Sequence, residues 1–384
     1  MPGFEVIDNK EFKEVSHVFK KSKILFRMGF EKKRKGIYKV KSFENLFSRK
    51  LKSKYALAVT SGTAALRVAL STLNLKRDDE VITQSFTFVA TVESIIESRA
   101  VPVCCDIDET LNMDPSDLKK KITKKTKAVI VVHMLGVSAK IDEIRKICSK
   151  RNIVLIEDTA WGCGAKFKNK FLGTWGDMGA FSFDFAKTIT TGEGGMLVFK
   201  KKTHYEKAAA WHDHGHENNP KFPRWEDTRK GSGFNFRMNE MQGAVGIAQL
   251  KKLGKIVKAQ NKNLNLIWNK IKSIKGIKKR EKPKNSTMSA DALIILMQSK
   301  RQALSLRKEL LKENISTKIL PEATKWHFAS NWEHIKELNL KYPKLKNEFK
   351  KSKKILDRAV SIPIFVKMKK TMPRQVRKAI ERIL

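Results

Sequence analysis

Short apolar runs alternate with amphipathic segments through the first part of the chain. The apolar runs are expected to be buried strands, and the segments between them carry apolar residues at helical spacing. The expected strands are residues 80–83, 101–106, 128–133 and 153–158. The expected helices are residues 91–97, 115–122 and 141–150. Such alternation predicts an α/β fold with a mostly parallel sheet, whose ligands collect beyond the carboxyl ends of its strands.

The two ends of the chain carry further elements. Helices are expected near residues 10–21 and 40–51, and a long helix over residues 238–260. A C-terminal α+β unit follows, with the expected elements at residues 292–297 (strand), 301–312 (helix), 315–320 (strand) and 373–384 (helix). At 384 residues, the chain has room for two domains. We expect an N-terminal segment and a large domain over residues 1–250, and a small C-terminal domain over residues 251–384.

The segment from residue 181 to residue 198 holds the most distinctive candidate for chemistry. Its ends, FSF and MLVF, are expected to be short strands, and between them Lys187 precedes three glycines grouped around one glutamate. Most lysines are solvent-exposed, and this chain is rich in them. Lys187 differs because its flanks are apolar, which makes it a candidate Schiff-base nucleophile.

Two other segments provide groups that a phosphorylated cofactor requires. A strand at residues 55–60, a Ser-Gly-Thr turn and a helix from Ala64 would place free backbone N–H groups where an anion can bind, although an ordinary helix cap has the same pattern. Asp158 ends an apolar strand, where an acid is usually a cap or turn residue. A pyridinium cofactor, however, needs a carboxylate at its ring nitrogen.

Composition narrows the class of protein. The net charge of +41 suggests nucleic acid as a partner, but the lysines are spread along the whole chain, so we expect no specific nucleic-acid function. No apolar run reaches about 20 residues, so we expect no membrane-spanning helix. The N-terminal residues lack the apolar core of a secretory signal, so we expect none. The four cysteines show no metal-finger spacing, and we expect reduced thiols in a cytoplasmic protein.

A histidine-rich segment, His212 to His216, raises the question of a metal site. On a strand, its three histidines would share one face. Gly215 and the polar residues that follow favour a loop instead, and no separate ligand set accompanies it. We expect a polar active-site loop or a surface loop, with no metal ion.

Taken together, these motifs resemble the fold-type-I pyridoxal-phosphate sugar aminotransferases of the DegT/DnrJ/EryC1/StrS type. The matching segments are TSGTAAL (60–66), SFTFVAT (85–91), IEDTAWGCGA (156–165), FSFDFAKTITTGEGG (181–195) and GFNFRMNEMQGAVG (233–246). Five further segments resemble the branch that makes 8-amino-3,8-dideoxy-manno-octulosonate for lipopolysaccharide: MPGFE (1–5), VHM (132–134), FDFAKTITTGEGG (183–195), DHGHENNP (213–220) and NWEHIKEL (331–338).

The resemblance implies roles for individual residues at the cofactor. Lys187 would bind pyridoxal phosphate covalently and shuttle the proton during transamination, and Asp158 would bind the pyridine nitrogen. Phe88 would stack on the ring. The phosphate would be held by Gly62, Thr63, Ala64 and the hydroxyl of Ser182.

Two more residues are implied to act at a shared or substrate site. Asn235 would reach the phosphate from the partner subunit, which implies a homodimer. Arg237 is a candidate for binding a substrate carboxylate, with a structural ion pair as the alternative. Where relatives have glutamine or histidine three residues after the aspartate, this chain has Trp161, a bulkier side chain that lacks the amide or imidazole contact.

The resemblance also implies the reaction. Glutamate would donate the amino group, and the acceptor would be the C8 aldehyde of oxidised 3-deoxy-manno-octulosonate. The first alternative is a nucleotide-linked keto sugar, and the second is a non-catalytic regulator or polyanion-binding protein on the same scaffold. A dehydratase is disfavoured because that branch has histidine in place of the lysine.

Overall fold

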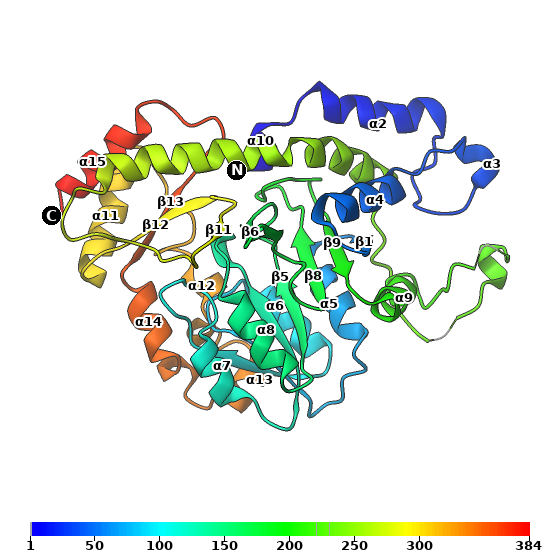
Figure 1. The fold of residues 1–384 in the computed structure, drawn as a ribbon, viewed down its shortest axis with the longest axis horizontal. Coiled ribbons are helices and arrows are strands. Elements are labelled where there is room, and N and C mark those ends of the chain that lie inside the picture. The colour runs from blue at the N-terminus through cyan, green and yellow to red at the C-terminus, as the bar shows by residue number, and fades with distance from the viewer. Residues whose placement is uncertain (1, 220, 230) are drawn as a thin grey trace.

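The computed structural model describes residues 2–219, 221–229 and 231–384 (Figure 1). At its centre is a seven-stranded sheet in the order β1-β9-β8-β5-β4-β2-β3. Its strands are β1 (Tyr55–Val59), β2 (Glu80–Gln84), β3 (Val101–Cys105), β4 (Thr126–Val132), β5 (Val154–Asp158), β8 (Met178–Ser182) and β9 (Gly195–Phe199). Within this sheet only β9 runs antiparallel to its neighbours. The predicted mostly parallel sheet is confirmed.

Both faces of this sheet are covered by helices, because successive side chains of a strand point to opposite faces. Leu57 and Ile156 pack with α5 (Gly62–Ser71), α6 (Ala90–Glu97) and α9 (Lys202–Trp211) on one face. The neighbouring Ala58 and Leu155 face the opposite layer. That layer contains α4 (Lys39–Leu51), α7 (Pro115–Lys121), α8 (Ile141–Ser149) and the first half of α10 (Glu240–Ile271).

Helix α10 runs along one side of the molecule, from the large sheet to the C-terminal sheet (Figure 1). It begins at an Asn239 cap, whose side chain accepts from the Gln242 N–H at 3.0 Å. Its second half packs on a three-stranded sheet with α11 (Lys300–Lys312) and α15 (Met372–Glu381). That sheet contains β10 (Lys278–Lys279), β12 (Ala292–Leu296) and β13 (Ala359–Pro363).

Shorter elements complete the described chain. At the N-terminus are α1 (Pro2–Glu5), α2 (Asn9–Lys21) and α3 (Glu31–Arg34). A second small sheet contains β6 (Lys166–Phe167), β7 (Lys170–Phe171) and β11 (Ser286–Thr287). The remaining helices near the C-terminus are α12 (Thr324–His327), α13 (Lys336–Lys341) and α14 (Lys350–Leu356).

The strand predicted at residues 315–320 is wrong. This segment lies beside β13, where Lys318 N–H donates to Ser361 O and Ser361 N–H donates to Leu320 O, each at 3.0 Å. The chain then turns towards α12, so the ladder does not extend into a regular strand. Its apolar residues are buried because they pack where the chain passes from β13 towards α12, and not because they belong to a sheet.

The division at residues 250 and 251 stays a prediction. That boundary lies inside the continuous helix α10. In addition, C-terminal residues pack on the edge strand β3 of the large sheet: Trp332 belongs to the same core as Phe86, and the Tyr342 hydroxyl accepts from the Cys104 N–H at 2.9 Å.

Candidate active site

The loop that carries Lys187 is closed at its base by backbone hydrogen bonds. It connects β8 to β9, which pair up to Ser182 opposite Gly195. Phe183 N–H then donates to Gly194 O at 2.8 Å, and Thr191 N–H donates to Phe183 O at 2.9 Å. These bonds fix both ends of the loop, so the end of the β8–β9 pair determines where Lys187 lies.

The Lys187 amine lies against the face of an indole ring. Its Nζ is 3.5 Å from the centroid of the Trp161 ring, and Lys318 Nζ is 4.9 Å from the same centroid. Loss of hydration lowers the pKa of Lys187 to about 8; the Lys318 charge acts in the same direction, while Asp184, Asp291 and Asp158 oppose it. A substantial fraction of this amine is therefore neutral near pH 8, as a nucleophilic amine requires.

Asp158 occupies the carboxyl end of β5 and is buried. Its Oδ1 accepts from the Ala160 N–H and its Oδ2 from the Thr91 hydroxyl, both at 3.1 Å. Burial raises the pKa of Asp158, and the two hydrogen bonds and the Lys187 charge partly offset that rise. A buried carboxylate of this kind is stabilised by an adjacent cation such as a protonated pyridine nitrogen.

The start of α5 lies directly beside Ser182. A Cβ added to Gly62 would be 2.7 Å from Ser182 Cβ, so only glycine allows this approach. The Ala64 N–H donates to the Ser61 side chain at 3.0 Å, whereas the Gly62 and Thr63 N–H groups belong to the first turn, which has no intrahelical acceptors. The predicted phosphate ligands are therefore adjacent, but the Ala64 N–H already has an acceptor.

Phe88 is partly exposed and lies next to the C-terminal segment. Its ring is 6.4 Å from the Trp326 ring in a stacked arrangement and 5.4 Å from the His327 ring. Burial lowers the pKa of His327 to about 4, and the Lys187 charge contributes to this shift. Phe88 therefore packs on the segment of residues 326 and 327 from the C-terminal part of the chain.

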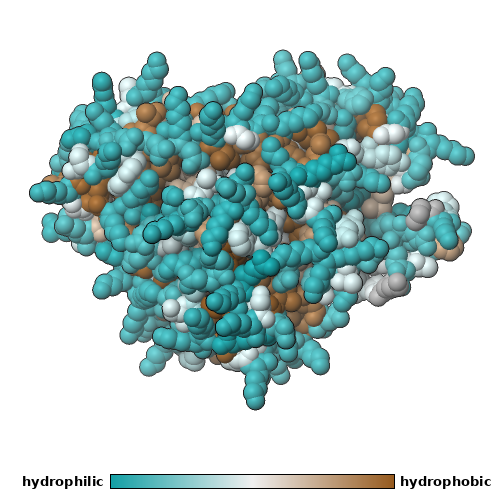
Figure 2. Space-filling model, in the orientation of Figure 1, coloured by the Kyte–Doolittle hydropathy of each residue, from teal (hydrophilic) through white to brown (hydrophobic). Residues whose placement is uncertain are grey.

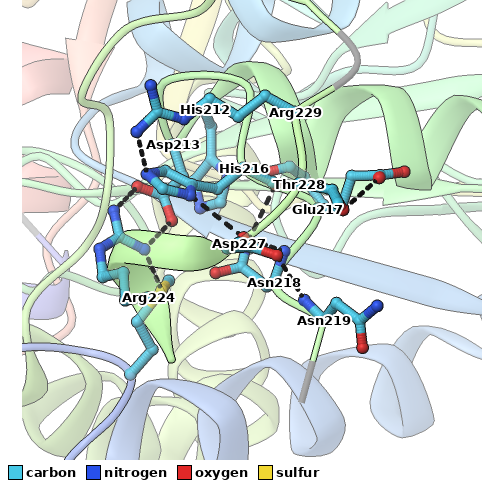
Figure 3. Close-up of polar contacts among 12 residues, drawn as sticks. His212, Asp213, His216, Glu217, Asn218, Asn219, Arg224, Asp227, Thr228 and Arg229 are labelled. Atoms are coloured by element: carbon cyan, nitrogen blue, oxygen red, sulfur yellow. Dashed lines mark hydrogen bonds and ion pairs between the residues drawn. The ribbon is translucent and has the colours of Figure 1, made fainter. Parts of the chain in front are cut away.

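Arg237 forms an ion pair with the buried Asp213. Asp213 also binds Arg224 through two hydrogen bonds, at 2.8 Å and 2.5 Å (Figure 3). Burial raises the pKa of Asp213, but the two guanidinium groups together lower it by more, so this pKa lies below its usual range. Asn235 is exposed, and its Oδ1 accepts from the Arg237 N–H at 3.4 Å. Within the described residues Asn235 makes no hydrogen bond to Lys187 or Asp158.

His212 and His216 have different partners, and Figure 3 shows that of His216. His212 lies 3.1 Å from an Arg27 nitrogen, and His216 Nδ1 lies 3.1 Å from Asp227 Oδ2. The described part of the chain contains no group of three metal-ligating side chains. Pro220, the last residue of the DHGHENNP motif, lies outside the described residues.

Sequence reasoning missed four residues of this site, one of which is His327, described above. Thr91 was part of a recognised motif, but nothing showed that it binds Asp158. Lys318 and Asp291, which form an ion pair beside Trp161, come from the C-terminal part of the chain. No local pattern distinguishes them from the many other charged residues.

The described side chains fit pyridoxal phosphate. An amine with a lowered pKa can bind its aldehyde, and the Asp158 carboxylate suits its ring nitrogen. The Gly62 and Thr63 N–H groups at the start of α5, next to Ser182, suit its phosphate. When bound, this cofactor supplies the electron sink for carbanion chemistry at the substrate carbon.

Comparison with known proteins agrees with this chemistry. The chain is 35% identical over 285 residues to a GDP-perosamine synthase of Escherichia coli O157:H7, covering 74% of this chain and 76% of that protein. It superposes on the aminotransferase from Psychrobacter cryohalolentis with a TM-score of 0.87 and 26% identity, covering 98% and 97% of the two chains. It also superposes on an E. coli GDP-4-keto-6-deoxy-D-mannose-3-dehydratase with bound hydrated pyridoxal phosphate, with a TM-score of 0.81, 26% identity and coverage of 98% and 97%.

A family model matches residues 19–381, which is most of the chain. The fold, the cofactor and the enzyme class expected from the motifs are confirmed by these comparisons. The chain belongs to the DegT/DnrJ/EryC1/StrS aminotransferase family, whose members are pyridoxal-phosphate-dependent sugar aminotransferases.

Proposed function

We propose that this enzyme transfers an amino group from glutamate to a keto sugar linked to a nucleotide. The observation that carries the proposal is the Lys187 amine, with its pKa of about 8, beside Asp158 in a chain related to a GDP-perosamine synthase. The E. coli dehydratase with the same fold is named for a nucleotide-linked 4-keto sugar. Lys187, in place of the histidine of the dehydratase branch, favours amino transfer over dehydration.

Each residue near the cofactor then has a role. Lys187 Nζ would hold the cofactor through its aldehyde and would carry the proton to and from the substrate carbon. Asp158 would keep the ring nitrogen protonated, and Thr91 holds the Asp158 carboxylate in position. Gly62, Thr63 and Ser182 would bind the phosphate, and Phe88 would lie on the ring.

The octulosonate aldehyde is a second candidate acceptor. The MPGFE segment that resembles this branch contacts the catalytic loop, where the Gly3 N–H donates to Lys187 O at 3.1 Å. A Cβ at Gly3 would lie 2.8 Å from Thr190 N, so this contact depends on glycine. Met1 of the segment lies outside the described residues.

A comparison of acceptors tests the proposal. Purified protein with pyridoxal phosphate and glutamate is incubated either with GDP-4-keto-6-deoxy-D-mannose or with the octulosonate aldehyde, and the products are identified by mass analysis. Amination of the nucleotide sugar, absent in Lys187→Ala, is the expected result. Amination of the octulosonate alone would replace the first proposal by the second, and no amination of either sugar would contradict both.

We also propose a homodimer with shared active sites, in the cytoplasm. Exposed aromatic side chains on the loop around Asn235 support the homodimer, since three of them, Phe222, Trp225 and Phe234, have at least 45% of their surface exposed.

The cysteines support the cytoplasmic location. All four are free and buried, as suits a reducing compartment. None of the described helices is long and apolar enough to cross a membrane.

Mixing two inactive variants tests the shared site. In a dimer where Asn235 acts on the partner's cofactor, Lys187→Ala and Asn235→Ala combine to give one intact site in each mixed dimer. Random exchange of subunits should then restore about a quarter of the wild-type activity. No recovery above the Asn235→Ala protein alone, with subunit exchange verified, would place Asn235 outside the partner's site.

A further inference from the structure

Arg280 lies in a buried position, and no carboxylate of the described residues forms an ion pair with it. It follows the edge strand β10, and only 7% of its surface is exposed. Its Nε donates to Thr110 O at 2.7 Å and its Nη2 to Asn112 Oδ1 at 3.5 Å. Its Nη1 makes no hydrogen bond within the described chain. Buried guanidinium groups are normally neutralised by a carboxylate or another anion.

Arg280 lines a cavity of about 100 Å3 between the C-terminal sheet and the segment around Val137. The cavity wall carries three cations and no carboxylate, and the rest of its lining is apolar. The lining residues are Val137, Lys279, Arg280, Lys282, Met288, Ala292, Leu293 and Ile294. A volume of this size holds about three water molecules or one small oxyanion.

The electrostatics around the cavity favour an anion. Burial lowers the pKa of Arg280 to about 9, and Asp108 is the acid whose charge opposes this shift. The Asp108 carboxylate, however, already binds Lys140 at 3.0 Å and the Thr110 N–H at 2.8 Å. The Arg280 charge is therefore incompletely compensated, and an anion at Nη1 would stabilise it.

The cavity lies next to two segments that hold Trp161 in place, around Val137 and around Met288. The wall residue Met288 precedes Ser289, whose hydroxyl donates to Trp161 O at 2.8 Å and whose N–H donates to Gly136 O at 3.1 Å. The wall residue Val137 follows Gly136. An occupant of the cavity would therefore contact two segments that hold the indole against Lys187.

We propose that this cavity is a binding site for a small oxyanion, a phosphate or a short carboxylate, held by Arg280 Nη1 next to the segments that hold Trp161 in place. The apolar lining suits the aliphatic part of a short carboxylate, and Nη1 provides the charge-assisted hydrogen bond. The proposal concerns binding only, so it stands or fails independently of which sugar is aminated.

Calorimetric titration of the enzyme loaded with pyridoxal phosphate tests the site. Inorganic phosphate and butyrate are the two probes, and the better binder identifies the source of the oxyanion. Arg280→Met should weaken binding of that probe at least about tenfold, because a charge-assisted hydrogen bond is lost. Arg301→Met, at an exposed position on α11, is the matched control and should bind as the wild type does.

A second variant separates binding from folding. Met288→Trp would fill the cavity while leaving Arg280 bound to Thr110 and Asn112, and it should also abolish binding. Binding that survives in Met288→Trp, or in a folded Arg280→Met, would overturn the proposal. So would the absence of binding of both probes to the wild type, which would leave the cavity to water.

Discussion

The lowered pKa of Lys187 makes a quantitative prediction about cofactor capture. Only the neutral amine attacks an aldehyde. At pH 8 a lysine with a pKa of about 8 is half neutral, whereas one at the ordinary value of 10.5 would be only about 0.3% neutral, a difference of about 150-fold. The rate at which protein freed of cofactor binds pyridoxal phosphate covalently should therefore rise to a plateau with a midpoint near pH 8.

Two substitutions perturb this midpoint in opposite directions. Lys318→Met removes a neighbouring positive charge, so the pKa of Lys187 and the midpoint should rise. Trp161→Leu removes the π face that attracts the ammonium at 3.5 Å but keeps an apolar side chain at this position, so the midpoint should fall, by less than about one pH unit. Only the electrostatic explanation predicts opposite signs for a cation and an aromatic ring that both act on the same amine.

The assay is stopped-flow absorbance of the covalent adduct, measured from about pH 6.5 to about pH 9.5, the range around the expected midpoint. Nα-acetyl-lysine in the same buffers is the control, since it reports how the ionisation of the cofactor itself affects the rate. A rate that still rises steeply at the highest pH, or the same midpoint in all three proteins, would refute the reasoning.

Three further predictions concern the cofactor and the loop of residues 213–237. Asp158→Asn should keep the cofactor bound, seen by its absorbance, but slow turnover on the order of 100-fold; turnover as fast as the parent would remove the role given to Asp158. Gly62→Ala places a Cβ 2.7 Å from Ser182 Cβ and should weaken cofactor binding by about 1–3 kcal/mol in a fluorescence titration, while Gly254→Ala, which meets no atom within 4 Å, should leave it unchanged. Asp213→Asn leaves Arg224 and Arg237 without their carboxylate and should lower the free energy of unfolding by about 1–3 kcal/mol in chemical denaturation; an unchanged stability would show that the ion pairs contribute little.

The sheet could be predicted because its strands are short, apolar and regularly spaced. Strands β2 to β5 start or end within two residues of their expected positions, since both of their faces are buried and few polar residues interrupt them. Residues 315–320 have a similar apolar composition but lie at a junction between segments. Composition alone does not distinguish burial at a junction from pairing in a ladder.

The groups along the sheet edge were likewise visible in sequence. Asp158 ends β5, while Gly62 and Lys187 follow β1 and β8, so the parallel directions of these three strands bring them to the carboxyl end of the sheet. Lys318, Asp291 and His327 reach the site from the C-terminal part through tertiary packing. The face shown in Figure 2 is mostly hydrophilic, as 31% charged residues would give, and in such a sequence Lys318 does not stand out from the other charged residues.

The most direct test of the account is reduction of the native enzyme with borohydride in the presence of pyridoxal phosphate, followed by peptide mapping. The account predicts one labelled residue, Lys187, and no label in Lys187→Ala. Label at any other lysine of the wild-type protein, or no label at all, would contradict it.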